Sequence, residues 1–315
     1  MALPFAPRRI VIGATAHAEL TSYLRERRPE LEIRGARMVE ITQGDLDWAE
    51  SYIGFRRPPG ASSLGKVRWV HCTGAGVDAW MTPEISRDVI LTRTPESFGP
   101  AIAEWAVSRV LAFQQQLAEV MQAQRERKWA PREILPVRGT RALVVGTGDV
   151  GSAVARQLSA LGVDVTGVSR TGRSDEPAFA AVYPVDALPH LVGEAQWIVL
   201  TLPITPATRG LFSRDILSRC RGAVLLNAGR GAVVDEAALS GALDQGWLRG
   251  AALDVFETEP LPESSPLWTD VRVMVSPHIS GLTTTAGAGD GFLECLAELE
   301  SGRLPAWVVD RERGY

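Results

Sequence analysis

Three segments in the last third of the chain carry residues that suit acid–base chemistry on a small anion. Arg230 follows an apolar run, Glu259 lies in a Thr-Glu-Pro turn, and His278 lies in the segment SPHISG. The planar guanidinium of arginine can bind two oxygens at once, and imidazole titrates near neutral pH. Reducing a 2-oxo acid needs a cation for its carboxylate and carbonyl oxygen, and an acid for the alkoxide that forms. We therefore interpret these segments as a candidate site for that reaction.

In this interpretation Arg230 binds the substrate, His278 is the general acid and Glu259 orients it. A carboxylate beside an imidazole favours the protonated form of the ring. Each residue also has an ordinary alternative, as a surface cation, a solvated turn residue or a loop cap. His71 is a competing acid, but its surroundings suit that role less well than those of His278.

A glycine-rich segment earlier in the chain predicts a dinucleotide site. Residues 141–151 read RALVVGTGDVG, an apolar strand leading to Gly146, Gly148 and Gly151 and then to a helix. The first glycine permits a tight turn, the second a close approach of the backbone to a pyrophosphate, and the third close helix–strand packing. Asp149 and Val150 open the helix, whose first N–H groups attract phosphate oxygens. Such glycines also occur in purely structural turns, but here strand, glycines, helix and second strand follow in the required order.

The end of the second strand indicates which dinucleotide binds. Residues 168–173 read VSRTGR, without the Asp or Glu that usually binds the ribose 2′-hydroxyl of NAD. Ser169, Arg170 and Thr171 instead offer hydroxyl donors and a cation, which suit a 2′-phosphate. We expect NADP to be preferred over NAD; the alternative is that Arg170 is a solvated loop residue.

Alternating apolar runs and helical patterns predict parallel α/β sheets. The expected strands are 9–14, 38–41, 52–55, 67–72, 141–145, 164–169, 197–202, 223–227, 250–255 and 272–275, and the expected helices include 18–28, 100–128 and 150–161. The tail from 292 is too short for a third domain and is expected to return to the first. We therefore expect a substrate domain of residues 1–98 and 283–315, with a dinucleotide-binding Rossmann domain of residues 99–282 inserted in it.

Composition narrows the class of protein. The chain has 315 residues with 45% hydrophobic and 22% charged residues, which is typical of globular proteins. Its net charge of −4 argues against a nucleic-acid partner. The scattered Cys72, Cys220 and Cys295 fit a reducing compartment, and no apolar run has the length of a membrane span. We expect a cytoplasmic protein without a metal site.

The chain resembles the D-isomer-specific 2-hydroxyacid dehydrogenase family over nearly its full length. The resemblance rests on GTGDVG at 146–151, LPITPATRGLF at 202–212, NAGRGAVVDEAAL at 227–239, GAALDVFETEPLP at 250–262, SPHISG at 276–281 and the closing RGY. It implies two Rossmann-like domains, each a doubly wound parallel sheet, and NAD(P)-linked reduction of a 2-oxo acid to the D-2-hydroxy acid. The matching Arg, Glu and His are catalytic in the family, which transfers to Arg230, Glu259 and His278.

The resemblance implies further contacts with ligands. The turn Gly74-Ala75-Gly76-Val77-Asp78 is similar to the family's substrate loop, in which N–H groups bind the carboxylate; this points to Ala75 and Gly76. Four more positions match residues that line the cofactor, with Asp254 near the nicotinamide carboxamide. They are Pro203, Ala228, Asp254 and Ser280.

The resemblance also bears on substrate and assembly. Residues 169–171 look like those of NADP-preferring glyoxylate and hydroxypyruvate reductases, and family members are generally homodimers built through the nucleotide domain. The long helix ending at Trp129 would suit that interface. Formate dehydrogenases of the wider group have Gln where this chain has Glu259, so formate oxidation is not expected. The first domain matches less closely, and Arg56, Arg57 and Trp48 are as consistent with surface and packing roles as with substrate contact.

Another class of function stays open. The family includes transcriptional corepressors, so the chain could be a dinucleotide-sensing scaffold without significant turnover. The absence of long disordered extensions favours an enzyme. Within enzymes, phosphite or a larger keto acid remains an alternative substrate.

Overall fold

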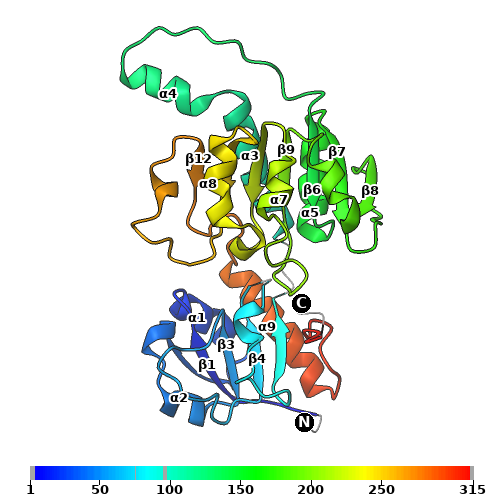
Figure 1. Ribbon diagram of the computed structural model, residues 1–315. Helices are drawn as coiled ribbons and strands as arrows, with labels where there is room; N and C mark the ends of the chain where they lie inside the picture. Colours follow the sequence, from blue (N-terminus) through cyan, green and yellow to red (C-terminus); the bar gives the residue numbers. More distant parts are fainter. Residues whose placement is uncertain (1–3, 75, 95–97, 313–315) are drawn as a thin grey trace. The chain divides into compact units, whose positions relative to one another are not determined.

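The structure is a computed structural model of the 315-residue chain and describes residues 4–74, 76–94 and 98–312. The chain forms two compact units (Figure 1). Unit 1 is Met1–Glu96 with Leu282–Tyr315, and unit 2 is Ser97–Gly281.

Unit 1 is built on a parallel sheet in the order β2-β1-β3-β4-β5. Successive residues of β1 point into opposite apolar layers, because side chains alternate along a strand. Val11 packs with one buried cluster, whereas Ile10 and Ile12 pack with the other. The elements are β1 (Arg9–Gly13), α1 (His17–Arg27), β2 (Glu32–Ala36), α2 (Gln43–Trp48), β3 (Ser51–Gly54), β4 (Trp69–Cys72), β5 (Ile90–Arg93) and α9 (Thr285–Glu300), with short 3-10 turns at Met38–Glu40 and Asp78–Trp80.

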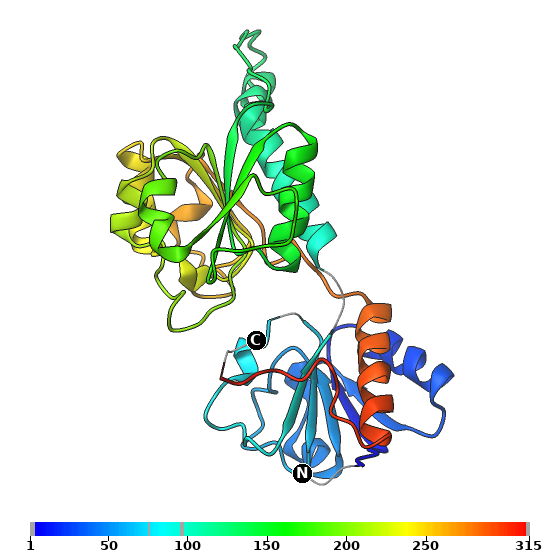
Figure 2. The same cartoon turned by 90° about the vertical axis from the view of Figure 1, so that its right-hand side faces the viewer.

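The end of the chain completes unit 1. Helix α9 packs against α1 and contributes Phe292, Cys295, Leu296 and Leu299 to the cluster that holds Ile10 (Figure 2). Beyond α9 the chain runs antiparallel beside β5, with a bridge between Thr92 and Val308. Residues from both parts of unit 1 therefore share one core.

Unit 2 has a parallel sheet in the order β12-β11-β10-β9-β6-β7-β8, with helices on both faces (Figure 2). Helices α3 and α5 cover one face, and α6, α7 and α8 cover the other. Its strands are β6 (Arg141–Val145), β7 (Asp164–Ser169), β8 (Ala181–Pro184), β9 (Trp197–Leu200), β10 (Ala223–Asn227), β11 (Leu248–Leu253) and β12 (Val273–Val275). Its helices are α3 (Gly99–Gln114), α4 (Leu117–Arg125), α5 (Asp149–Ala160), α6 (Leu188–Leu191), α7 (Arg214–Ser218) and α8 (Glu236–Asp244), with 3-10 turns at Val185–Ala187, Gly231–Val233 and Pro266–Trp268. These two parallel sheets confirm the expected fold class.

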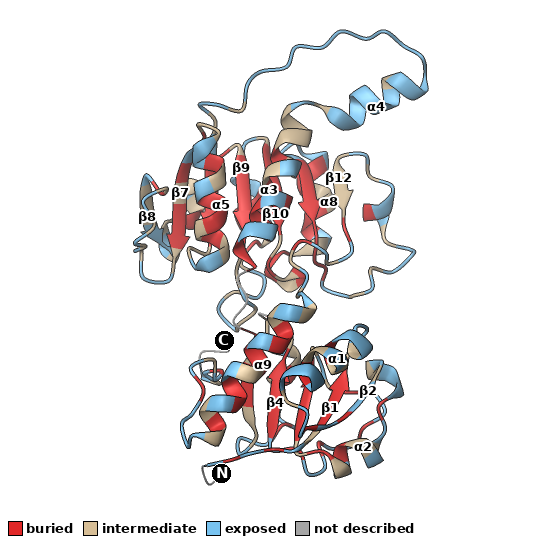
Figure 3. Ribbon diagram, turned by 180° about the vertical axis from the view of Figure 1, so that it is seen from behind, coloured by how far each residue is buried: buried red, intermediate tan, exposed pale blue. Residues whose placement is uncertain are grey.

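Two expected elements of the chain are wrong. The helix expected over 100–128 breaks, because Gln116 has a φ of +50°, and α3 and α4 lie on either side of it. Every residue of α4 is at least partly exposed, as Figure 3 shows. The strand expected at 38–41 is a 3-10 turn, and the strand is β2 instead. Its residues EIRGA bury only Ile33, so β2 has little apolar alternation to reveal it.

Candidate active site

The expected site residues of unit 2 lie where its parallel strands end. Gly146 follows β6, Ser169 ends β7, Arg230 follows β10, Asp254 follows β11 and His278 follows β12. The carboxyl ends of parallel strands share one edge of the sheet, and the strand order reverses there between β6 and β9. Ligands of open α/β sheets bind at such a reversal. Three more expected residues lie in loops at the same ends of strands: Pro203 after β9, Ala228 after β10 and Ser280 after β12.

The three glycines of the loop after β6 meet different requirements. Gly146 has a φ of +104°, a conformation that L side chains rarely adopt. A Cβ at Gly151 would lie 1.8 Å from the carbonyl oxygen of Gly146, so only glycine permits this helix–strand approach. A Cβ at Gly148 would meet no described atom within 4 Å. The backbone is thus open at Gly148, where a pyrophosphate would approach it.

Helix α5 begins immediately after that opening. Gly148 is its N-cap, and Asp149 and Val150 are its first residues. The first N–H groups of a helix lack partners within the helix and carry a partial positive charge. Thr201 Oγ1 donates to the carbonyl oxygen of Gly146 at 2.9 Å and fixes the turn from the neighbouring strand. The loop and helix end therefore fit a dinucleotide phosphate.

The end of β7 is a tight turn with exposed cations. Ser169 Oγ accepts a hydrogen bond from the Arg173 N–H and donates one to the Arg173 carbonyl oxygen, both at 3.1 Å. Its hydroxyl hydrogen therefore bonds within the turn, whereas the sequence analysis predicted a hydroxyl that donates to the cofactor. Arg170, Thr171 and Arg173 are exposed around it. Arg173 was not among the expected cofactor residues, although it lies in the same six-residue segment.

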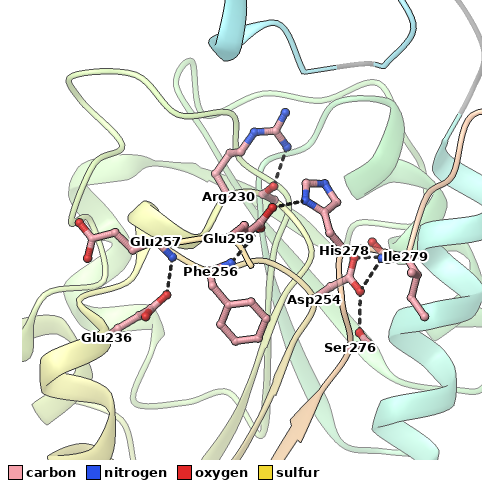
Figure 4. A network of polar contacts seen from close by, with 11 residues as sticks. Arg230, Glu236, Asp254, Phe256, Glu257, Glu259, Ser276, His278 and Ile279 are labelled. Carbon is pink, nitrogen blue, oxygen red and sulfur yellow. Dashed lines mark hydrogen bonds and ion pairs between the residues drawn. The ribbon is translucent and has the colours of Figure 1, made fainter. Parts of the chain in front are cut away.

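His278 and Glu259 form a directly bonded pair (Figure 4). The distance from His278 Nδ1 to Glu259 Oε2 is 2.9 Å, and Glu259 Oε1 accepts from the Phe256 N–H at 3.1 Å. Burial opposes ionisation of Glu259. The hydrogen bonds from His278 and Phe256 and the charges of His278 and Arg230 outweigh it, so the pKa of Glu259 is lowered. An ionised Glu259 therefore holds the ring through Nδ1.

Arg230 lies close enough to add its charge to this pair, since it contributes to the lowered pKa of Glu259. The buried Asn227 fixes the loop that carries it. Asn227 Nδ2 donates to the Arg230 carbonyl oxygen at 3.0 Å, and its Oδ1 accepts from the Gly229 N–H at 3.1 Å. The structure therefore brings together the three residues expected to act on the substrate.

The backbone of His278 is held in an uncommon conformation. Its φ is +54°, in the left-handed region. The fully buried Asp254 holds this loop: Oδ1 accepts from Ser276 Oγ at 2.5 Å and the Ile279 N–H at 3.0 Å, and Oδ2 accepts from the Ser280 N–H at 2.8 Å. Asp254 thus anchors the loop of His278, a role that the sequence did not indicate. Its contact with the nicotinamide carboxamide stays a prediction.

Sequence reasoning also missed Ser276 and Trp105. Trp105 Nε1 on α3 donates to Ser276 Oγ at 3.0 Å, and both residues are buried. Nothing in the sequence spacing links them, because 171 residues separate them. Because Ser276 also donates to Asp254, this bond connects the loop that Asp254 anchors to helix α3.

The remaining expected residues belong to unit 1. Ala75 lies outside the described residues. The carbonyl oxygen of Gly76 accepts from Cys72 Sγ at 3.4 Å. His71 is fully buried, with Nδ1 2.9 Å from Thr92 Oγ1 and Nε2 3.3 Å from Thr94 Oγ1. Burial lowers the pKa of His71 to about 3, so it is neutral near pH 7 and does not suit the role of competing acid.

The buried His71 predicts acid-sensitive stability. A folded-state pKa of about 3, below the unfolded value of 6.5, means that the unfolded chain binds the extra proton between these values. This contribution to stability is complete above about pH 6.5 and falls by up to ~1.4 kcal/mol per pH unit below it. Urea unfolding of His71→Gln from pH 7 to 4 should show a shallower pH dependence than the wild type. Equal slopes in the wild type and His71→Gln would contradict the prediction.

Comparison with known proteins places this geometry in a family. Residues 107–280 match the profile of "D-isomer specific 2-hydroxyacid dehydrogenase, NAD binding domain". The glyoxylate/hydroxypyruvate reductase A of Serratia proteamaculans (strain 568) is 32% identical over 304 residues, covering 93% of this chain and 94% of that protein. The chain belongs to the D-isomer specific 2-hydroxyacid dehydrogenase family and is an oxidoreductase.

Solved structures agree with this assignment. The crystal structure of a D-isomer specific 2-hydroxyacid dehydrogenase from Xanthobacter autotrophicus Py2, in complex with NADPH and MES, has a TM-score of 0.87 and 32% identity, covering 98% of this chain and 100% of that one. The NADPH-dependent glyoxylate/hydroxypyruvate reductase of Sinorhizobium meliloti, in complex with NADP and sulfate, has a TM-score of 0.85 and 27% identity, covering 98% and 99%.

The described helices and side chains bear on other classes of function. No helix in the described part of the chain is long and apolar enough to cross a membrane. Across residues 4–74, 76–94 and 98–312, no group of three His, Cys, Asp or Glu side chains is arranged to hold a metal ion.

Proposed function

We propose that the protein reduces a small 2-oxo acid of the glyoxylate or hydroxypyruvate class to the D-2-hydroxy acid, using NADPH in preference to NADH. The observation that carries the proposal is the bonded pair of His278 and Glu259 with Arg230 beside it, at the sheet edge that also holds the dinucleotide loop. Relatives named glyoxylate/hydroxypyruvate reductase support the substrate class.

In the proposed reaction the chain's residues handle the carboxylate and the proton. The bound nicotinamide supplies a hydride to the carbonyl carbon of the substrate. Arg230 binds the carboxylate and carbonyl oxygen through its planar guanidinium. His278 donates a proton to the oxygen of the former carbonyl, whose charge grows as the hydride arrives. Glu259 holds the ring through Nδ1 and stabilises its protonated form.

The proposed cofactor-binding residues are those of the loop after β6 and the edge around it. NADP is favoured because Arg170 and Arg173 are exposed at the end of β7, where a carboxylate would repel a 2′-phosphate. The solved relatives with NADPH and NADP support this preference. The proposed set is Gly146, Gly148, Asp149, Val150, Gly151, Ser169, Arg170, Thr171, Arg173, Pro203, Ala228, Asp254 and Ser280.

Arg170→Ala should separate the two cofactors. A charged hydrogen bond contributes about 1.5–3 kcal/mol, so the Kd for NADPH should rise about 10- to 100-fold while that for NADH changes little. Fluorescence titration of both cofactors measures the ratio. Arg141→Ala is a matched control, because Arg141 is exposed at the opposite end of the parallel strands. If the preference for NADPH survives in Arg170→Ala, our interpretation of this turn is wrong.

We propose the remaining roles from the family resemblance. Residues 1–98 and 283–315 form the substrate domain, in which N–H groups of Ala75 and Gly76 bind the substrate carboxylate, and residues 99–282 form the dinucleotide domain. The protein is a homodimer built through the segment around α4. A cavity of about 1030 Å³ lies between this segment and the body of unit 2. The segment itself exposes large apolar side chains: Leu117, Val120, Met121, Trp129 and Leu135. A second copy that covers them would double the molar mass in sedimentation analysis.

A steady-state screen tests the function as a whole. Glyoxylate, hydroxypyruvate, pyruvate and bulkier 2-oxo acids are each assayed with NADPH and NADH. We expect the highest kcat/KM with one of the first two acids and NADPH. Tight binding of the cofactor with no turnover across the panel would instead support the scaffold alternative.

A further inference from the structure

Glu236, the first residue of α8, lies next to the proposed catalytic residues without being one of them. Its Oε1 accepts a hydrogen bond from the Glu257 N–H at 2.5 Å (Figure 4). Glu257 and Glu259 both lie in the loop after β11. Glu236 lies in the next part of the chain after Arg230, where that segment passes into α8. The bond therefore joins the loop of the substrate-binding cation to the loop of the carboxylate that orients His278.

The same two segments also meet through their backbones. A Cβ at Gly231 would lie 1.9 Å from the carbonyl carbon of Phe256 and 2.3 Å from the nitrogen of Glu257. The Phe256 N–H in turn donates to Glu259 Oε1. Phe256 and Glu257 are thus fixed by Gly231 on one side and by the Glu236 carboxylate on the other. The Phe256 N–H links this segment directly to the carboxylate of Glu259.

The surroundings of Glu236 oppose its ionisation. Burial raises the pKa of Glu236 and the charges of Glu257 and Glu259 raise it further, whereas the N–H of Glu257 opposes this. The contact with the Glu257 N–H does not require a charge on Glu236, because a neutral carboxyl group also has an oxygen that accepts a hydrogen bond.

We propose that Glu236 is a positioning residue of this reaction. Its carboxyl group fixes the loop of Glu259 relative to Arg230 by accepting the Glu257 N–H. This inference rests on the proposed function. Glutamine tests this contact, because it retains an oxygen that accepts the Glu257 N–H.

Three variants of the full-length protein test the proposal. Glu236→Ala should lower kcat about 10- to 100-fold, because misplacement of reacting groups by about 1 Å has effects of this size. Its Kd for NADPH should stay at the wild-type value. Glu236→Gln should restore kcat to within about threefold, because its amide oxygen still accepts the Glu257 N–H. Glu257→Ala is the matched control, since its exposed side chain is removed and its N–H remains.

The outcomes that overturn the proposal are distinct. Wild-type kcat in Glu236→Ala, or equal losses in the Ala and Gln variants, would remove the positioning role. If kcat falls only in those variants whose Tm also falls, Glu236 stabilises the fold and does not position the site.

A measurement without turnover keeps this test separate from that of the proposed function. The chain has four histidines, so the ring resonances of His278 can be assigned by their loss in His278→Gln. In NMR spectra of the imidazole nitrogens, Glu236→Ala should shift these resonances, whereas Glu257→Ala should not. If the wild type shows no turnover, the proposed function fails, but these spectra still decide whether Glu236 positions the pair. Unchanged resonances in Glu236→Ala would overturn the inference.

Discussion

His278→Ala should lower kcat with a 2-oxo acid and NADPH by about 10²- to 10⁴-fold, the usual contribution of general acid catalysis. The ring is held by Glu259 through Nδ1, and in the proposed function its other nitrogen donates the proton. Alanine at 278 removes the donor and leaves the dinucleotide loop intact. Steady-state kinetics gives kcat, and fluorescence titration should give an unchanged Kd for NADPH.

His190→Ala provides the control for this variant. His190 lies on α6, away from the strand ends, and its loss should leave kcat at the wild-type value. Glu259→Gln should fall between the two, because glutamine can still contact the ring but no longer stabilises a positive charge. Wild-type turnover in His278→Ala would rule out its assignment as the acid.

Arg230→Ala should damage both binding and turnover. The guanidinium is expected to bind the carboxylate in the ground state and the carbonyl oxygen as it gains charge, so KM should rise and kcat should fall. At about 1.5–3 kcal/mol for each charged hydrogen bond, kcat/KM should fall by about 10²- to 10⁴-fold. Steady-state kinetics over a wide range of substrate concentration separates the two constants.

Two further variants define what Arg230 contributes. Arg230→Lys keeps the charge without the planar pair of donors and should recover only part of the loss. Arg221 precedes β10 at its amino end, whereas Arg230 follows the carboxyl end of the same strand. Arg221→Ala should therefore keep wild-type kinetics. A similar loss in both alanine variants would show that the effect is one of general charge or stability.

Local patterns predicted those parts of the fold and site that depend on residues close in sequence. The glycines at 146, 148 and 151 match the turn, the open backbone and the helix contact, because each requirement acts within six residues. The strand β2 was missed because it buries so little, and the break at Gln116 was missed because a left-handed residue other than glycine leaves no clear mark in the sequence.

The supporting contacts of the site could not be predicted in this way. The bond of Trp105 to Ser276 and the bonds of Asp254 to residues 276–280 depend on how α3, β11 and β12 pack. Likewise, the sequence predicted a free hydroxyl donor at Ser169, whereas in the structure this hydroxyl donates to the carbonyl oxygen of Arg173. Residue type indicates what a side chain is able to do, but only the packed structure decides which partner it has.

The shared core of unit 1 has a consequence for biosynthesis. Phe292, Leu296 and Leu299 of α9 fill the same apolar layer as Ile10 and Ile12 of β1. During translation, the first strands leave the ribosome long before α9 is made, so the part of their apolar face that α9 covers stays exposed to water until then. Unit 2 is continuous in sequence and can fold in the meantime. Unit 1 can therefore complete its core only after the rest of the chain has been made.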